Sequence, residues 1–266
     1  MTFGPKIIPH SGGRVFPGRR GINPGAALTA RSAALPAAFS AAIPAVLMAC
    51  LLLAGTAAAQ SEVRIDDFSQ TMDNNEVPDK WNFNKITFTE DEGIYFRFVH
   101  DDSDGTHFIH LKSGKDNSYM VGKGGFEYEV ADLPILEWEW RVVTLPTGGD
   151  VRIEEKDDQA ASICVVIDPG TFGADETLCY IWENKGPVGA ELTSTKREDS
   201  KYIILRAADT DQLGKWYKER RNTLEDFKRV FGYEPPDEAI IGVQIDSDST
   251  ESSAEVYYRN IILKKR

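Results

Sequence analysis

Two adjacent carboxylates beside an aromatic residue form the first group of side chains whose types and spacing could bind a ligand. Asp157 and Asp158 directly precede a strand predicted over 160–168. The next predicted strand ends at Trp182, and a short connection containing Pro-Gly joins the two, so we expect an antiparallel hairpin. Trp182 and Asn184 then lie close to the two carboxylates. A ring that stacks on a sugar, beside carboxylates that accept its hydroxyl groups, predicts a glycan site; a solvated acidic loop is the plainer alternative.

A second acidic group, Asp-Ser-Asp-Ser-Thr, follows the strand predicted over 239–245. Oxygen ligands fall on alternate residues, Asp246, Asp248 and Thr250, which is the spacing that a Ca²⁺ loop supplies. The segment is not an EF-hand, because Glu251 stands where the turn glycine should be. An ordinary polar turn is the alternative. If this strand pairs antiparallel with the first strand of the hairpin, the two acidic groups become one cluster. Calcium is the one cofactor that the sequence suggests.

A third pair of carboxylates, Glu137 and Glu139, lies on a strand predicted over 136–145. Side chains alternate between the two faces of a strand, so Trp138 and Trp140 should face the core while the glutamates and Arg141 face outward. The ordinary interpretation is a half-buried strand with a solvated row of charges. The alternative is a glycosidase, because alternate residues of a strand lie about 6.5–7 Å apart, within reach of two-carboxylate chemistry.

Cysteines and histidines offer further chemistry. Cys164 and Cys179 lie near register on the two arms of the predicted hairpin, where they could form a disulfide in an oxidising compartment or remain buried thiols. His107 and His110 should point to opposite faces of their strand, which argues against a zinc site shared with His100.

Composition limits the class of protein. The chain has 266 residues, with 30 Lys and Arg against 42 Asp and Glu and a formal net charge of −12, which excludes an ordinary nucleic-acid binder. Residues 1–59 hold five basic and no acidic residues, then an apolar run of 10 residues, Ala45 to Ala54, and a small-residue stretch. This order is typical of a signal peptide cleaved near Ala59/Gln60, and a membrane-spanning helix would need about 20 apolar residues.

The exported part, residues 60–266, therefore carries 25 basic and 42 acidic residues, a net charge of −17 over 207 residues. This length fits a single domain with a sizeable core. We expect a periplasmic or secreted protein with no stable membrane span after cleavage.

The exported part is expected to be all-β: a jelly-roll-type two-sheet β-sandwich with one short helix. Many short strands separated by Gly, Pro and Asp turns favour this class. The helix is predicted over 223–232, with a Thr-Asp capping pair at its start and Gly232 at its end. The predicted strands are 62–68, 93–100, 107–112, 126–130, 136–145, 160–168, 177–182, 201–206, 239–245 and 255–263.

Short motifs that carry a family resemblance are spread along the whole exported part. They are Ile65–Phe68, Pro134–Trp140, Lys156–Ala161, Cys164–Asp168, Leu178–Trp182, Gly214–Trp216, Glu219–Asn222, Glu225–Phe227, Phe231–Gly232 and Asp246–Thr250. With these motifs the chain resembles the bacterial domain of unknown function 3047 family, which implies an exported domain and no particular activity. One departure is Ser162, where the family pattern leads us to expect Arg. More loosely, the opening Asp-Asp-Phe and the closing Tyr-Tyr-Arg-Asn-Ile-Ile-Leu strand are similar to galactose-binding-like jelly rolls, whose first and last strands often pair.

Three functions remain open. We expect the first of them, which is not enzymatic. It is a binding module for carbohydrate or a cell-envelope glycan. The second is a polysaccharide hydrolase or lyase that uses Glu137/Glu139 or Asp157/Asp158. The third is a structural envelope protein that binds another protein through a sheet edge. The ligand-binding set predicted for the first function is Asp157, Asp158, Trp182, Asn184, Trp216 and Asp226.

Overall fold

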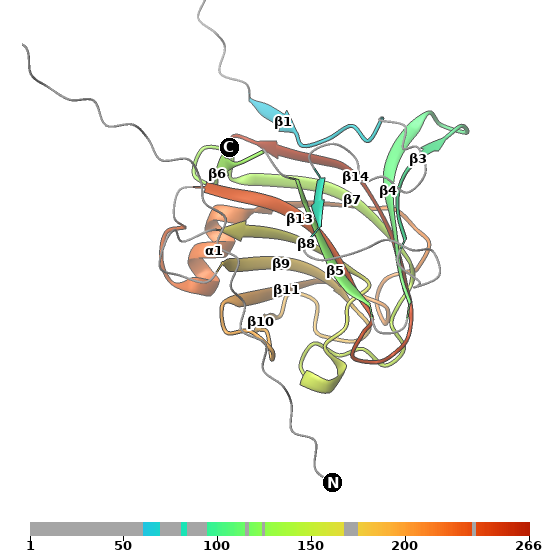
Figure 1. Cartoon of the computed structure of the whole chain (residues 1–266). Coiled ribbons are helices and arrows are strands. Elements are labelled where there is room, and N and C mark those ends of the chain that lie inside the picture. Colours follow the sequence, from blue (N-terminus) through green and yellow to red (C-terminus); the bar gives the residue numbers. More distant parts are fainter. Residues whose placement is uncertain are drawn as a thin grey trace, which may run out of the picture. The chain divides into compact units, whose positions relative to one another are not determined.

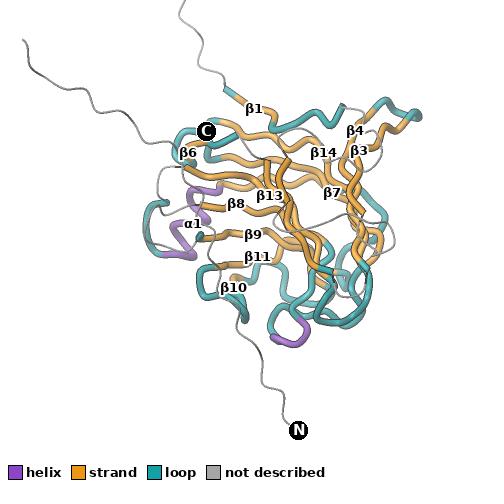
Figure 2. Tube along the Cα trace, viewed as in Figure 1, coloured by secondary structure: helices purple, strands orange, loops and turns teal. Residues whose placement is uncertain are grey.

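The computed structural model describes residues 61–69, 81–83, 95–114, 117–123, 126–167, 175–235 and 238–266. They form two β-sheets and one α-helix (Figures 1 and 2). The signal peptide predicted over 1–59 lies outside the described residues. Within the described ranges, no helix is long and apolar enough to cross a membrane.

The first sheet, here called the six-stranded sheet, is antiparallel throughout. Strand β1 (Glu62–Arg64) pairs with the end of β14 (Ala254–Lys264), so the predicted pairing of the first and last strands is confirmed. The other strands run in the order β12 (Tyr217–Asn222), β7 (Ile135–Thr144), β14 (Ala254–Lys264), β4 (Thr106–Ser113) and β3 (Tyr95–Asp101).

The second sheet has eight strands and contains the predicted hairpin. Strands β8 and β9 pair antiparallel, with Cys164 opposite Cys179. Strand β11 pairs with β9 in parallel, and all the other strand pairings in this sheet are antiparallel. The order is β10 (Glu191–Thr193), β11 (Ser200–Ala207), β9 (Glu176–Glu183), β8 (Ala161–Ile167), β13 (Glu238–Asp246), β5 (Ser118–Lys123) and β2 (Trp81–Phe83), with β6 (Tyr128–Glu129) beside β13.

The core lies between the two sheets, where rings from facing strands meet. Trp138 and Trp140 of β7 are 0% exposed, as the alternation of that strand predicts. Trp138 lies 5.4 Å from Tyr180 of β9, and Trp140 lies 5.7 Å from Trp182 of the same strand, both measured between ring centroids. These contacts join the sheets and leave the alternate side chains of β7 on its outer face.

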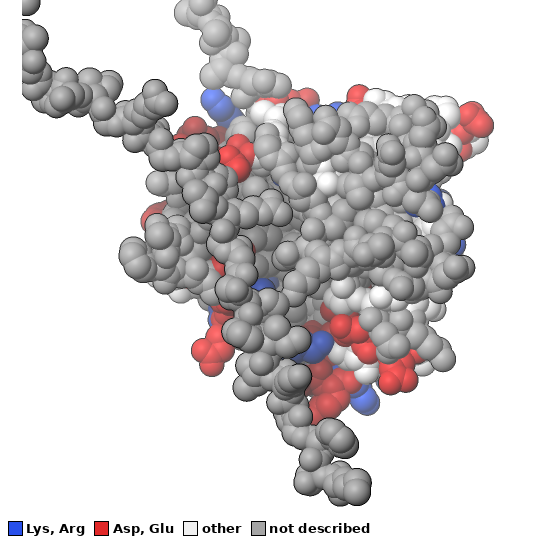
Figure 3. Space-filling model, viewed as in Figure 1, with Lys and Arg blue, Asp and Glu red and all other residues white. Residues whose placement is uncertain are grey.

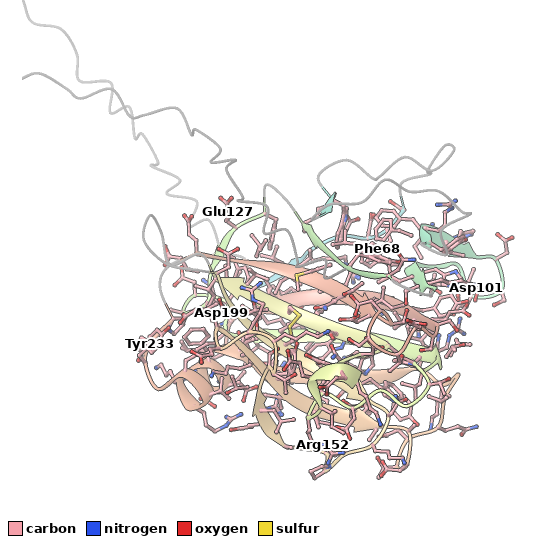
Figure 4. The ribbon with its side chains drawn as sticks, turned by 60° about the horizontal axis from the view of Figure 1, so that its bottom comes forward. Phe68, Asp101, Glu127, Arg152, Asp199 and Tyr233 are labelled. Atoms are coloured by element: carbon pink, nitrogen blue, oxygen red, sulfur yellow. A yellow bond between two sulfur atoms is a disulfide. The ribbon has the colours of Figure 1, made fainter. Side chains whose placement is uncertain are left out.

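A smaller apolar cluster lies on the opposite face of β8 and β9. It contains the disulfide between Cys164 and Cys179, drawn in yellow in Figure 4, together with Tyr202 and Ile204 of β11. Val151, from the loop before the short 3₁₀ helix η2 (Glu154–Lys156), packs on this cluster. Asp and Glu side chains gather at the lower edge of the view in Figure 3, where Figure 1 draws η2 in yellow-green.

The helix α1 (Thr223–Phe231) ends at Gly232 as predicted, with a left-handed backbone (φ 87°) that glycine adopts without strain. Its start differs from the prediction. The N-cap is Asn222, whose side chain accepts a hydrogen bond from the backbone N–H of Glu225. Thr223 instead donates through Oγ1 to the carbonyl of Pro134, so its hydroxyl fastens the helix to the chain before β7.

Candidate functional site

The predicted carboxylates at the start of β8 are buried and hold a turn. Asp158 is 0% exposed. Its carboxylate accepts hydrogen bonds from the backbone N–H groups of Ser249 (2.9 Å) and Thr250 (2.7 Å) and from Thr250 Oγ1 (2.6 Å). Asp157 is 2% exposed, and burial raises the pKa of its carboxyl. Asp158 therefore fastens the turn after β13, Asp157 accepts instead from Gln159 Nε2 at 2.7 Å, and neither carboxylate presents much surface to a ligand.

The two acidic groups meet, because β13 pairs antiparallel with β8. One oxygen from each of Asp158, Asp246 and Asp248 lies within 4.8 Å of the others. Burial, and then the neighbouring carboxylates of Asp248 and Asp158, raise the pKa of Asp246 to about 8. Lys196 Nζ lies 3.8 Å from Asp248. Thr250 lies beside this group but gives its hydroxyl hydrogen to Asp158. The Ca²⁺ site at Asp246, Asp248 and Thr250 stays a prediction.

Trp182 and Asn184 have structural partners instead of a free surface. Trp182 is 0% exposed, with its ring 5.3 Å from that of Tyr217, so it cannot stack on a sugar. Trp182 and Tyr180 are two residues apart on β9, so their side chains lie on the same inward face. This alternation is hard to recognise in the sequence because Trp182 lies at the end of the strand. Asn184 Nδ2 donates to the carbonyls of Pro146 (2.5 Å) and Gly149 (3.1 Å) and so holds the loop before η2.

Asp226 lies in α1 and is 3% exposed. Its carboxylate binds Arg221 and Arg229 and accepts the Tyr180 hydroxyl at 2.8 Å. Despite its burial, hydrogen bonds from Arg221 and Arg229 hold the pKa of Asp226 below its usual value. This network anchors the helix to β9 and β12. The predicted ligand set thus separates into a buried acidic pair (Asp157 and Asp158), a core ring (Trp182), a loop anchor (Asn184), a helix anchor (Asp226) and Trp216.

The outward carboxylates of β7 are ion-paired. Glu137 binds Arg220 and lies 3.0 Å from Lys264 Nζ. These cations hold the pKa of Glu137 below its usual value, although burial opposes them. Glu139 lies 2.8 Å from Arg259 Nε. A glycosidase acid requires a raised pKa, and the pKa of Glu137 is shifted in the opposite direction.

Rings and guanidinium groups gather on the outer face of the six-stranded sheet, in a group here called the aromatic platform. Its side chains come from β3, β4, β7 and β14, and from the residue that precedes β12. On each strand they occupy the outward positions, alternate to the core residues. Sequence reasoning missed most of this group, although aromatic residues at outward positions of β4 and β14 are its signal. The members are Tyr95, Phe108, His110, Arg141, Trp216, Tyr257 and Arg259.

The rings of the aromatic platform pack against one another across the strands. His110 and Tyr257 are register partners and stack with centroids 4.1 Å apart and planes 12° apart. Tyr95 lies edge-on to His110 at 4.8 Å. Phe108 lies 5.2 Å from Tyr257 and 5.9 Å from Trp216. Phe108 and His110 are buried, whereas Tyr95, Trp216 and Tyr257 are half-buried and keep accessible surface.

Two arginines complete the aromatic platform. Arg141 is the register partner of Tyr257 on β7, and its Cζ lies 4.2 Å from the Tyr257 centroid and 5.0 Å from that of Trp216. Arg259 Cζ lies 4.2 Å from the Trp216 centroid. Cation–π contacts of this kind fix the planes of the guanidinium and ring. Trp216 is thus the one predicted ligand residue on this face.

The carboxylate of Glu255 holds the far side of the aromatic platform. It accepts from His110 Nε2 at 2.7 Å and the Tyr257 hydroxyl at 3.1 Å, and lies 3.3 Å from Lys112 Nζ. Burial lowers the pKa of His110, although the hydrogen bond to Glu255 opposes that shift. His107, by contrast, packs against His100 at 4.5 Å on the other face of the hairpin, so the predicted opposition of His107 and His110 is confirmed.

A pocket of about 250 Å³ lies elsewhere, beside β8, β13 and the residues before β6 and β9. Its lining is acidic and aliphatic and includes Glu127, labelled in Figure 4. The remaining lining residues are Val166, Asp175, Glu238, Ala239 and Ile240. The described residues of its lining include no aromatic side chain and no cation, so they offer neither stacking nor oxyanion recognition.

Comparison with known proteins relates the chain to solved β-sandwiches and to one family. A family 11 carbohydrate-binding module of the cellulosomal cellulase Lic26A-Cel5E of Clostridium thermocellum is 11% identical, with a TM-score of 0.42, over 77% of this chain and 95% of that one. A family 30 carbohydrate-binding module of the cellulase CEL9D-CEL44B, also of Clostridium thermocellum, is 8% identical, with a TM-score of 0.36, over 64% of this chain and 82% of that one. The likeness concerns the fold.

The curated proteins contain no match to the chain. The family described as "Protein of unknown function (DUF3047)" matches residues 79–262, which is more than half of the sequence. The chain therefore belongs to the DUF3047 family.

Proposed function

We propose that the chain is an exported, non-catalytic module that binds carbohydrate through the aromatic platform. The observation that carries this proposal is the half-buried pair Trp216 and Tyr257, held beside Arg141 and Arg259 on one sheet face. The exposed part of each half-buried ring can pack against the apolar face of a pyranose, and guanidinium N–H groups donate to sugar oxygens.

Preorganisation supports binding at this face. The rings are fixed by strand register and by contacts with one another. The carboxylate of Glu255 accepts from His110 Nε2 at 2.7 Å, and that of Glu139 accepts from Arg259 Nε at 2.8 Å. A rigid platform loses little side-chain entropy when a ligand binds.

Catalysis has less support from the carboxylates. Glu137 and Glu139 are ion-paired, and the Asp157/Asp158 pair is almost fully buried. Glu183 is a carboxyl with a raised pKa, to about 7, and burial is the main cause. It is 0% exposed and accepts from the backbone N–H groups of Val151 and Asn184, so a substrate cannot reach it.

Export is part of the proposal. The signal-peptide pattern of residues 1–59 supports it, and so does the disulfide between Cys164 and Cys179, because structural disulfides persist in oxidising compartments. Secretion into culture medium or periplasm, measured by fractionation with an antibody, tests this part separately.

A glycan array probed with residues 60–266 tests the function. The expected result is binding to at least one polysaccharide, weakened about tenfold or more by Trp216→Ala, which corresponds to about 1.4 kcal/mol. Tyr233→Ala is the matched control, because Tyr233 is 46% exposed but lies beyond α1, away from the platform. Absence of binding to every glycan would favour a structural envelope protein that recognises another protein.

A further inference from the structure

Arg141 differs from the other cations around the aromatic platform in lacking an acidic partner. Arg259 pairs with Glu139 at 2.8 Å, and Lys112 pairs with Glu255 at 3.3 Å. Among the residues that the structure describes, no carboxylate forms an ion pair with Arg141, and its Nε is buried without a hydrogen-bond partner. A buried donor without an acceptor costs free energy, so this atom has an unmet requirement for an acceptor.

The surroundings of Arg141 fix the guanidinium without neutralising it. Three rings enclose it: its Cζ lies 4.2 Å from the centroid of Tyr257, 5.0 Å from Trp216 and 6.0 Å from Phe108. Two carboxylates of this face are already engaged, since Glu139 binds Arg259 and Glu255 binds His110 and Lys112. Asp101, at the end of β3, interacts with Arg141 through its charge, and the Tyr257 hydroxyl through a hydrogen bond, but neither forms an ion pair with it. The positive charge of Arg141 is therefore available beside two half-buried rings.

We propose that the aromatic platform selects acidic glycans, and that Arg141 binds the carboxylate of a uronic acid residue. This inference rests on the proposed function, because it names the class of sugar that the same face would take. The planar fork of a guanidinium matches a carboxylate with two parallel hydrogen bonds. Trp216, 5.0 Å away, is placed to cover the ring of the sugar that carries this carboxylate.

Because the chain is acidic, selectivity for an acidic glycan has to come from local contacts. The chain carries a formal charge of −12, so long-range electrostatics repel a polyanion. Attraction must come from contact with Arg141, in a partly desolvated setting where a charged hydrogen bond is strongest. Affinity for an acidic glycan should therefore fall only modestly with salt, unlike binding by a broad basic surface.

Calorimetry on residues 60–266 tests the inference with three ligands: an oligouronate, its carboxyl-reduced neutral counterpart, and a sulfated oligosaccharide of similar length. The expected result is that the oligouronate binds about ten- to a hundredfold more tightly than the neutral counterpart. Arg141→Gln should abolish that preference and leave weak binding of the neutral ligand. Trp216→Ala should weaken both.

Arg152→Gln is the charge-matched control, because Arg152, labelled in Figure 4, is exposed, pairs with Asp150 in the loop before η2 and is not a member of the platform. Thermal melts establish that each variant folds. Equal affinity of wild type and Arg141→Gln for the oligouronate would overturn the inference while leaving glycan binding intact. Preference for the sulfated ligand alone would overturn the carboxylate assignment. No binding of any ligand would overturn the proposed function itself.

Discussion

Replacing Glu183 by Gln should remove part of the pH dependence of the free energy of unfolding. Glu183 ends β9, is 0% exposed, and accepts from the backbone N–H groups of Val151 (3.1 Å) and Asn184 (2.7 Å). Burial raises the pKa of its carboxyl from 4.5 to about 7, and those two hydrogen bonds oppose the shift. Between these values the folded state binds more protons than the unfolded state, so stability falls as pH rises.

The magnitude follows from the size of the shift. One pH unit is worth about 1.4 kcal/mol for a fully coupled proton, so Glu183 contributes a loss of about 3 kcal/mol between pH 4.5 and pH 7. Urea unfolding of wild type and Glu183→Gln at pH 5, 6 and 7, with chelator present, measures the two slopes. The variant should show a slope smaller by up to about 1.4 kcal/mol per pH unit.

Glu154→Gln is the control for loss of one carboxylate, because Glu154 is exposed on η2 close to the same loop. The wild-type protein has other buried carboxyls with raised pKa values, such as Asp246, so the comparison depends on the difference between variants. If Glu183→Gln keeps the wild-type slope while remaining folded, the carboxyl is ionised in the native state and the argument from burial is wrong.

Three further outcomes are expected. If the predicted Ca²⁺ site forms, Ca²⁺ at a hundredfold excess over its Kd should stabilise the protein by about 2.7 kcal/mol, and Asp246→Asn should abolish the effect; an unchanged Tm at saturating Ca²⁺ contradicts the prediction. Reduction of the disulfide between Cys164 and Cys179, 15 residues apart, should lower the free energy of unfolding by about 3 kcal/mol in the chain-entropy model, measured in urea with and without reductant. Asn222→Ala should cost about 1 kcal/mol by removing the N-cap of α1, and equal urea midpoints for the two proteins would refute that role.

Local alternation made much of the sandwich predictable. On β7 the pattern places Trp138 and Trp140 inward, and both rings meet β9 in the core. The β8–β9 hairpin follows from two apolar runs and a turn. By contrast, no strand was predicted at β12. Its sequence Tyr-Lys-Glu-Arg-Arg-Asn is polar on both faces, and pairing with β7 decides its conformation.

The candidate site was less predictable because its parts are distant in sequence. Arg141, Trp216 and Tyr257 come from segments separated by tens of residues, and only the strand order β12-β7-β14-β4 brings them together. The sequence does reveal acidic runs, but it does not reveal their partners. Asp158 is a turn anchor and Asp226 a helix anchor because of hydrogen bonds that no local pattern encodes.

The competing functions differ in what they require of the charged side chains on β7. What matters is whether each charge has an ion-pair partner, and not only that the charge is present. Its outward row contains Glu137, Glu139 and Arg141, which by type alone fits both a glycosidase and a solvated surface. The two carboxylates are ion-paired with Arg220, Lys264 and Arg259, and the pKa of Glu137 lies below its usual value, whereas a general acid needs a raised one. The arginine at the end of the row is enclosed by rings and has no described acidic partner. On this face an arginine donor therefore lies beside aromatic surface, an arrangement that supports the proposed binding of an oxyanion-bearing sugar over its cleavage.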